Sequence, residues 1–193
     1  MIGTLTPGFA EPVGDAQSCF RLVLDSMARP GRVHNVGGVD APAPLCNAAA
    51  AVLLTLLDHE TPLWLAPEAE AARAWIAFHT GAPTVDDPAR AMFALALCPA
   101  MTEWSCLPAG TDEAPETSAT VILQVASLAT GRDFVLAGPG LRQPAILTVD
   151  GLPADFAAVW QRNRALFPRG IDLILCAGDR LTALPRTVMV EEV

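Results

Sequence analysis

The sequence predicts an α/β protein in which a mixed central sheet is covered by helices on both faces. Two observations lead to this fold. Apolar segments of strand length alternate with segments of helical periodicity along the chain. In the second half, strand segments are joined by short turns, which adds antiparallel pairs to the sheet. The 193 residues are 52% hydrophobic, and no linker or repeat divides them. We therefore expect residues 1–193 to form one domain.

The first predicted helix begins at Asp15, a residue type that caps helix N-termini. It ends before Pro30-Gly31, which interrupts helical structure. Arg21 and Asp25 are expected to form an i,i+4 ion pair on its polar side. Its buried side is predicted to consist of Phe20, Val23, Leu24 and Met27.

The remaining elements follow from periodicity and from their Gly and Pro boundaries. A helix over residues 44–57 is apolar nearly all round, which places it inside the protein. A hairpin is predicted between residues 119–127 and 133–137, turning at 129–132. Residues 99–118, with three prolines and four acids, are predicted to form a surface loop. The other predicted helices are 67–78 and 153–167, and the other predicted strands are 32–36, 61–65, 91–98 and 145–149.

Residues 167–187 are the most informative part of the sequence. Residues 171–176 form a short, nearly unbroken apolar run between two glycines, which favours a strand buried on both faces. Gly178-Asp179 suits a two-residue hairpin turn, and this turn places Leu173 opposite Leu184. Pro185 has no N–H to donate, so the return strand must end there or run along an edge.

This hairpin brings Arg169, Asp172 and Arg186 to one end of the sheet. Two interpretations remain open for these residues. They form a structural ion pair at the strand ends, or they bind an anionic ligand. A second group of cations, Arg162, Arg164 and Arg169, has no acid between Asp155 and Asp172. It could complement a helix dipole, dock an acidic partner or bind phosphate.

The composition excludes several classes of function. All twelve basic residues are arginine. A chain without lysine cannot form the Schiff base of pyridoxal phosphate or the phosphate contact of a Walker motif, so neither cofactor chemistry is expected. The net charge of -9 argues against nucleic-acid binding. The first residues lack the pattern of a secretion signal and no segment is long enough to span a bilayer, so no membrane association is expected.

Cysteines and histidines provide no metal or catalytic pattern. The five cysteines show no Cys-x-x-Cys spacing, which predicts reduced thiols in a cytoplasmic protein and no metal site. An enzyme with a cysteine nucleophile stays as an unrelated alternative. His79 is the best-placed histidine, because it ends a predicted helix, where the dipole itself explains it. We expect no catalytic residue in this chain.

Six segments in order resemble the PhnH family, the H subunit of the bacterial carbon-phosphorus lyase system. They extend from about Asp15 to Thr187, apart from residues 99–118. They are Phe20-Arg21 with Met27-Ala28-Arg29-Pro30-Gly31, Leu53-Leu54-Thr55-Leu56-Leu57-Asp58 with Thr61-Pro62-Leu63-Trp64-Leu65, Phe78-His79-Thr80-Gly81-Ala82-Pro83, residues 122–128, residues 167–175, and Leu184-Pro185-Arg186-Thr187.

The resemblance implies a role in phosphonate catabolism. PhnH-like chains belong to a core complex with G, I and J subunits and contact mainly the G subunit. With the G, I and L subunits they are required to displace adenine from ATP by an alkylphosphonate. The family is similar to the large domain of pyridoxal-phosphate transferases, a three-layer α/β/α fold, without the cofactor, and its members form dimers in isolation. The chain is then either a non-catalytic structural subunit, which we favour, or it contributes residues such as Arg21, Arg169 or Arg186 to an ATP or phosphonate site.

Overall fold

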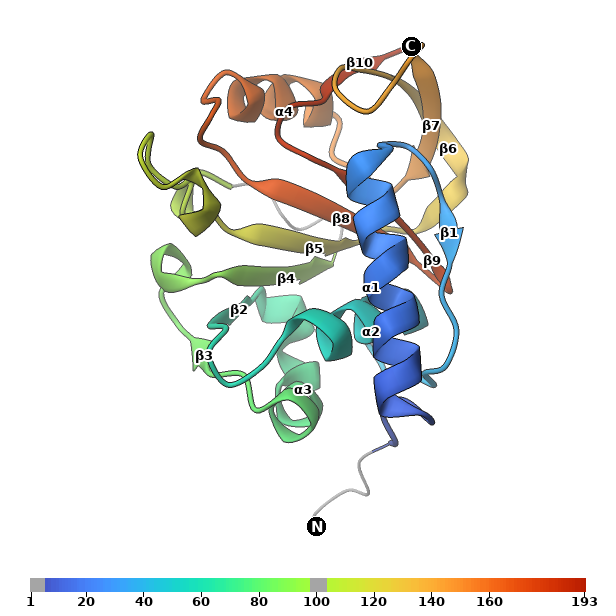
Figure 1. Cartoon of the computed structure of the whole chain (residues 1–193), viewed down its shortest axis with the longest axis vertical. Helices are drawn as coiled ribbons and strands as arrows, with labels where there is room; N and C mark the ends of the chain where they lie inside the picture. Colours follow the sequence, from blue (N-terminus) through green and yellow to red (C-terminus); the bar gives the residue numbers. More distant parts are fainter. Residues whose placement is uncertain (1–5, 98–103) are drawn as a thin grey trace.

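A computed structural model describes residues 6–97 and 104–193 and shows a mixed α/β architecture (Figure 1). A seven-stranded sheet has the order β1-β9-β8-β5-β4-β2-β3, and a second sheet of three strands has the order β10-β6-β7. The helices are α1 (Pro12–Ala28), α2 (Asn47–Leu56), α3 (Arg73–Thr80) and α4 (Phe156–Arg164). The strands are β1 (His34–Asn35), β2 (Leu63–Leu65), β3 (Thr84–Val85), β4 (Phe93–Leu97), β5 (Thr120–Gln124), β6 (Ser127–Ala137), β7 (Ala145–Asp150), β8 (Asp172–Ala177), β9 (Arg180–Leu184) and β10 (Met189–Glu192).

The large sheet is mixed, as the sequence predicts. Strands β3, β2, β4, β5 and β8 pair in parallel, whereas β9 pairs antiparallel with both β8 and β1. The β8–β9 hairpin has the predicted register, with Leu173 opposite Leu184. The return strand ends at Leu184, directly before Pro185, because proline cannot donate to the ladder.

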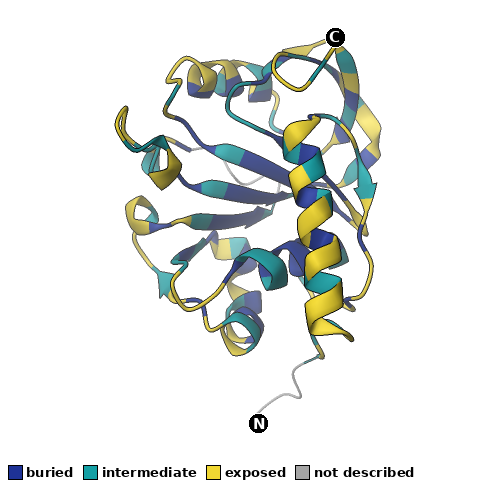
Figure 2. Cartoon of the chain, in the orientation of Figure 1, coloured by how far each residue is buried: buried dark blue, intermediate teal, exposed yellow. Residues whose placement is uncertain are grey.

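Alternating side chains of the central strands supply two separate cores. On β5, Val121 and Leu123 enter one core, whereas Ile122 between them enters the other. β8 repeats the pattern, with Leu173 on the first side and Ile174 on the second. Successive side chains of a strand point to opposite faces of the sheet. A strand with apolar residues at every position is therefore buried on both faces. Figure 2 shows these strands as the most continuously buried part of the chain.

Helices α1, α2 and α3 cover one face of the large sheet (Figure 1). α2 is packed in this layer, and its residues 48–53 are fully buried, which confirms the prediction of an internal helix. Residues 67–78, predicted as one helix, form a 3-10 helix over Pro67–Ala72 followed by α3.

The opposite face is covered by α4 together with the three-stranded sheet. The predicted hairpin between residues 119–127 and 133–137 is wrong, because β6 pairs with β7 and β10 and β5 stays in the large sheet. The wrong prediction arose from Gly131, which was interpreted as a turn residue. It marks a register shift within the long strand β6, where its φ is +121° and a Cβ would lie 2.3 Å from the Val149 carbonyl oxygen. A glycine that permits a bulge and a glycine that permits a turn look alike in sequence.

The first helix differs from its prediction in three ways. It begins at Pro12, and Asp15 in its first turn accepts a hydrogen bond from the Glu11 backbone N–H at 2.9 Å. Phe20 and Leu24, predicted to be buried, are 49% and 57% exposed. Asp25 pairs with Arg29, not with Arg21. The buried side consists of Cys19, Val23 and Ser26, so the helix rests on the sheet along a narrower stripe than its apolar residues indicate.

The predicted surface loop over residues 99–118 is only partly confirmed. Residues 98–103 lie outside the described part of the chain. From residue 104 onward the segment contains short 3-10 helices, and Trp104 and Leu107 are buried in the same core as α4. The prolines and acids of this segment favour an exposed loop, but burial of the two large apolar side chains holds part of it against the core. In the part of the chain that the structure describes, no helix is long and apolar enough to cross a bilayer.

Candidate functional site

Asp172 and Arg186 form a bidentate ion pair at the start of β8, where the hairpin places them. Arg186 Nη2 lies 2.5 Å from Asp172 Oδ2, and Nε lies 3.2 Å from Oδ1. The Arg186 backbone N–H also donates to Oδ1 at 2.8 Å. The two side chains are 13% and 21% exposed. A planar guanidinium that matches a carboxylate on two atoms, partly shielded from water, is the strongest type of ion pair geometry.

The other donors of Arg186 are also occupied. Nη1 donates to the carbonyl oxygens of Pro115 at 2.9 Å and Pro168 at 3.4 Å, and Nη2 donates to Ser118 Oγ. A guanidinium has five N–H groups, and all five have protein acceptors. Arg186 therefore joins the segment before β5, the segment before β8 and the end of β9. This geometry favours the structural interpretation of the pair over a ligand site.

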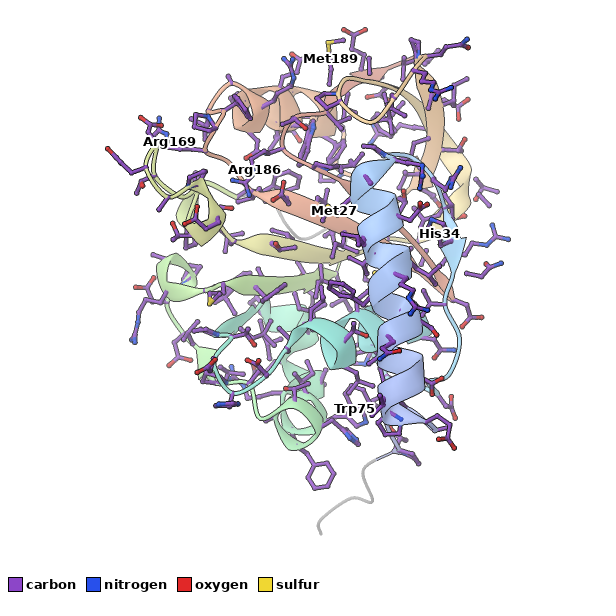
Figure 3. The ribbon with its side chains drawn as sticks, viewed as in Figure 1. Met27, His34, Trp75, Arg169, Arg186 and Met189 are labelled. Atoms are coloured by element: carbon purple, nitrogen blue, oxygen red, sulfur yellow. The ribbon has the colours of Figure 1, made fainter. Side chains whose placement is uncertain are left out.

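Arg169 lies near this cluster but projects outward. Its Nε is 3.2 Å from Asp112 Oδ1, and both side chains are largely exposed. Figure 3 shows Arg169 at the outer edge of the molecule and Arg186 further inside. Both arginines contact the 104–118 segment, and neither lines the two cavities at the end of α4 that are described below.

Gly170, which follows Arg169 in the sequence, lies in a sterically restricted position. Its φ is +120°, and a Cβ would lie 3.0 Å from two atoms of Asn163. Asn163 is buried and exchanges two hydrogen bonds with the backbone of Ile171, donating from Nδ2 at 2.9 Å and accepting at Oδ1 at 2.8 Å. The end of α4 is thereby attached to the residue before β8.

His79 and Arg21, also candidates from the sequence, lie elsewhere. His79 Nε2 is 3.1 Å from the Thr6 carbonyl oxygen, which also accepts from Trp75 Nε1 at 2.9 Å. The two α3 side chains thus hold the N-terminal segment against the helix, which is a structural role. Arg21 is exposed on α1 and forms no hydrogen bond or ion pair within residues 6–97 and 104–193. The structure brings together Asp172 and Arg186, with Arg169 beside them, and separates the other two.

A second charged cluster surrounds Asp25 at the end of α1. Arg29 pairs with one carboxylate oxygen, whereas Arg32 Nη1 and His34 Nε2 approach the other at 3.1 and 3.0 Å. Burial, followed by the guanidinium groups of Arg32 and Arg29, lowers the pKa of His34. His34 is thus held within the ion cluster by Asp25.

Cys19, Cys46 and Cys176 give no sign of an activated nucleophile. Burial raises the pKa of Cys19 and Cys46, and it raises the pKa of the fully buried Cys176 much further. A raised pKa disfavours the thiolate, which is the nucleophilic form. Cys98 lies outside the described residues. Within residues 6–97 and 104–193 no three His, Cys, Asp or Glu side chains gather as a metal site would require.

Two cavities flank the end of α4, and sequence reasoning did not predict them. The larger has a volume of about 480 Å³ and is walled by apolar side chains together with Arg162 and Asn163. The smaller, of about 330 Å³, is lined by Pro139, Arg164, Phe167 and Thr187. The run of arginines at 162–169 was the only signal of this region, since no pattern places Trp104 opposite α4.

The mixed sheet, covered on both faces, places the chain among the α/β proteins. Comparison with known proteins is more specific. The chain belongs to the bacterial phosphonate metabolism protein (PhnH) family, whose model matches residues 7–191.

Two curated relatives have similar lengths. The chain is 43% identical over 190 residues to the alpha-D-ribose 1-methylphosphonate 5-triphosphate synthase subunit PhnH of Rhizobium meliloti (strain 1021), covering 95% of this chain and 94% of the relative. It is 30% identical over 176 residues to the putative C-P lyase subunit protein HtxG of Stutzerimonas stutzeri, covering 90% and 85%.

Proposed function

We propose that this chain is a subunit of the carbon-phosphorus lyase system for phosphonate catabolism. With its partner subunits, it is required to transfer the ribose triphosphate moiety of ATP to an alkylphosphonate, with adenine as the leaving group. The observation that carries this proposal is the 43% identity to a synthase subunit over nearly the full length of both chains. The second relative, named as a C-P lyase subunit, supports the same assignment.

Within this system, the chain acts as a structural subunit. The most conspicuous charged pair, Asp172–Arg186, supports this role, because every guanidinium N–H of Arg186 already has a protein acceptor. An Arg without free donors has none for a phosphonate or a triphosphate. The raised pKa values of the buried thiols support the same conclusion.

The finer features of the proposal come from the family resemblance. Residues 1–193 form a single PhnH-like domain that corresponds to the large domain of pyridoxal-phosphate transferases without the cofactor, and the absence of lysine is consistent with this. The chain forms a dimer in isolation and assembles with G, I and J subunits, contacting mainly G. We place it in the cytoplasm, where free thiols such as Cys19 and Cys176 persist.

Reconstitution tests the function directly. Purified G, I and L subunits are mixed with ATP and methylphosphonate, with and without this chain, and free adenine is measured. We expect adenine release only when the chain is present. Equal release without it would refute the requirement.

The alternative is that Arg21, Arg169 or Arg186 binds ATP or phosphonate. Exposed Arg21 and Arg169 favour it more than Arg186 does. Titration calorimetry of the isolated chain with ATP and methylphosphonate distinguishes the two roles, since micromolar binding that is lost in Arg169→Ala would support the alternative.

A further inference from the structure

The segment from Arg162 to Arg169, which we call the α4 end, carries an unusual combination of side chains. Leu166 is 39% and Phe167 63% exposed, although both are large and apolar. The larger cavity is walled by Trp104, Leu107, Val159, Leu166 and Ile171, with Arg162 as its only charged side chain among the described residues. The smaller cavity lies against Arg164 and Phe167. Two hollows therefore flank one short segment.

The three arginines of the α4 end differ in whether their side chains have partners within the protein. Arg164 Nε donates to the Thr187 carbonyl oxygen at 3.2 Å, and Arg169 pairs with Asp112. Arg162 is exposed and forms no hydrogen bond or ion pair with any residue that the structure describes. The dipole of α4 favours a cation in its last turn, but a dipole does not explain why that cation borders an apolar cavity.

The charge of the surroundings selects the chemistry of an occupant. The chain has a net charge of -9, yet no acidic residue occurs between Asp155 and Asp172. An unpaired guanidinium beside apolar walls attracts a group that combines a negative charge with apolar surface. Arg and exposed aromatic side chains next to a pocket are also the composition typical of the energetic centre of a protein interface.

The arrangement favours a protein segment over a small anion. A small molecule would fill one cavity and leave Phe167 exposed, because Phe167 borders the other cavity. A chain segment laid along the α4 end covers both cavities and the two exposed side chains between them.

We propose that the α4 end docks an acidic segment of a partner subunit. An apolar side chain of that segment enters the 480 Å³ cavity, and carboxylates flanking it pair with Arg162 and, at the second cavity, with Arg164. The inference rests on the proposed function, because it requires a partner within the lyase complex.

The test measures binding of the full chain to the purified assembly of G, I and J subunits by calorimetry. Arg162→Glu is expected to weaken binding by at least about 10-fold, because it places like charges together. Leu166→Asp, which puts a charge at the cavity wall, should weaken it similarly. Raising the salt concentration from about 0.1 to 0.5 M should weaken binding of the wild type more than binding of Arg162→Ala. Salt screens the ion pair of Arg162, and the variant lacks this pair.

Arg180→Glu is the matched control. Arg180 is exposed at the start of β9 and has no side-chain partner among the described residues, so the same change of net charge is made away from α4. It should leave the affinity within about 2-fold of the wild type. Melting temperatures of all variants verify folding.

Three results would overturn the proposal. Arg162→Glu binds as well as the wild type, or it loses no more affinity than Arg180→Glu, or the isolated chain binds ATP or methylphosphonate through Arg162 while assembly is unaffected. If the wild-type chain does not join the G, I and J assembly, the proposed function itself fails and the docking surface fails with it.

Discussion

Two carboxylates in this protein gather cations, and their surroundings differ. Asp172 holds one arginine, Arg186, in a pair whose side chains are 13% and 21% exposed. Asp25 is shared by Arg29, Arg32 and His34, and the two arginines are 55% exposed. Counting ion pairs would rank the Asp25 cluster higher. Burial and the number of satisfied donors rank the Asp172 cluster higher, because water screens exposed charges and replaces their partners.

The largest expected effect comes from Arg186→Ala. It removes five side-chain hydrogen bonds and leaves the partly buried Asp172 carboxylate without its positive partner, so we expect a loss of about 2 to 4 kcal/mol in the free energy of unfolding. Asp172→Ala should cost about 1 to 3 kcal/mol. Urea unfolding measures both, with Arg180→Ala as the control expected within about 0.5 kcal/mol of the wild type. An Arg186→Ala protein that is fully stable but inactive in adenine release would instead assign the arginine to a ligand.

The exposed cluster should tolerate the same type of change. Arg29→Ala and Arg32→Ala are each expected to lower the free energy of unfolding by less than about 1 kcal/mol, since exposed pairs contribute little. The same urea series measures them. If either variant lost as much stability as Arg186→Ala, exposure would not be what separates the two clusters.

The smallest effect concerns pH. The folded-state pKa of His34 is lowered, by burial first and then by Arg32 and Arg29. Below the ordinary histidine pKa of about 6.5, the unfolded chain therefore binds more protons at this site than the folded one. The contribution of His34 to stability is complete above that pH and declines as the pH falls from it towards the folded-state value.

NMR titration of His34 measures this shift directly. In Arg32→Ala one of the repelling cations is gone, so the pKa of His34 should move upwards towards its ordinary value. An unchanged or lower pKa in Arg32→Ala would show that Arg32 does not contribute to lowering the pKa of His34.

The sequence predicts the fold correctly where the local pattern and the tertiary packing favour the same structure. The β8–β9 register, the end of β9 at Pro185 and the internal position of α2 were all predicted, because turn chemistry and strong apolar runs determine them. The pairing of β6 was not, since strand partners are chosen by long-range packing that a bulge glycine does not reveal.

The candidate site divides in the same way. Asp172 and Arg186 were predicted to lie together because the hairpin joins them. The further hydrogen bonds from Arg186 to Pro115, Pro168 and Ser118 were not predicted, because these acceptors belong to other segments of the chain. Phe20 and Leu24 were assigned to the core by their spacing, but periodicity gives the apolar side of α1 without saying how much of it the sheet covers.

The strand order has a consequence for synthesis on the ribosome. β8 and β9, the latest strands of the large sheet along the chain, lie between β5 and β1, which are made much earlier. Until residue 184 has left the exit tunnel, β5 presents an unpaired edge and β1 has no strand partner among the described residues. Unpaired edges of this type invite association with other chains. The large sheet is therefore completed only in the last part of synthesis, when β8 and β9 fill the gap between β5 and β1.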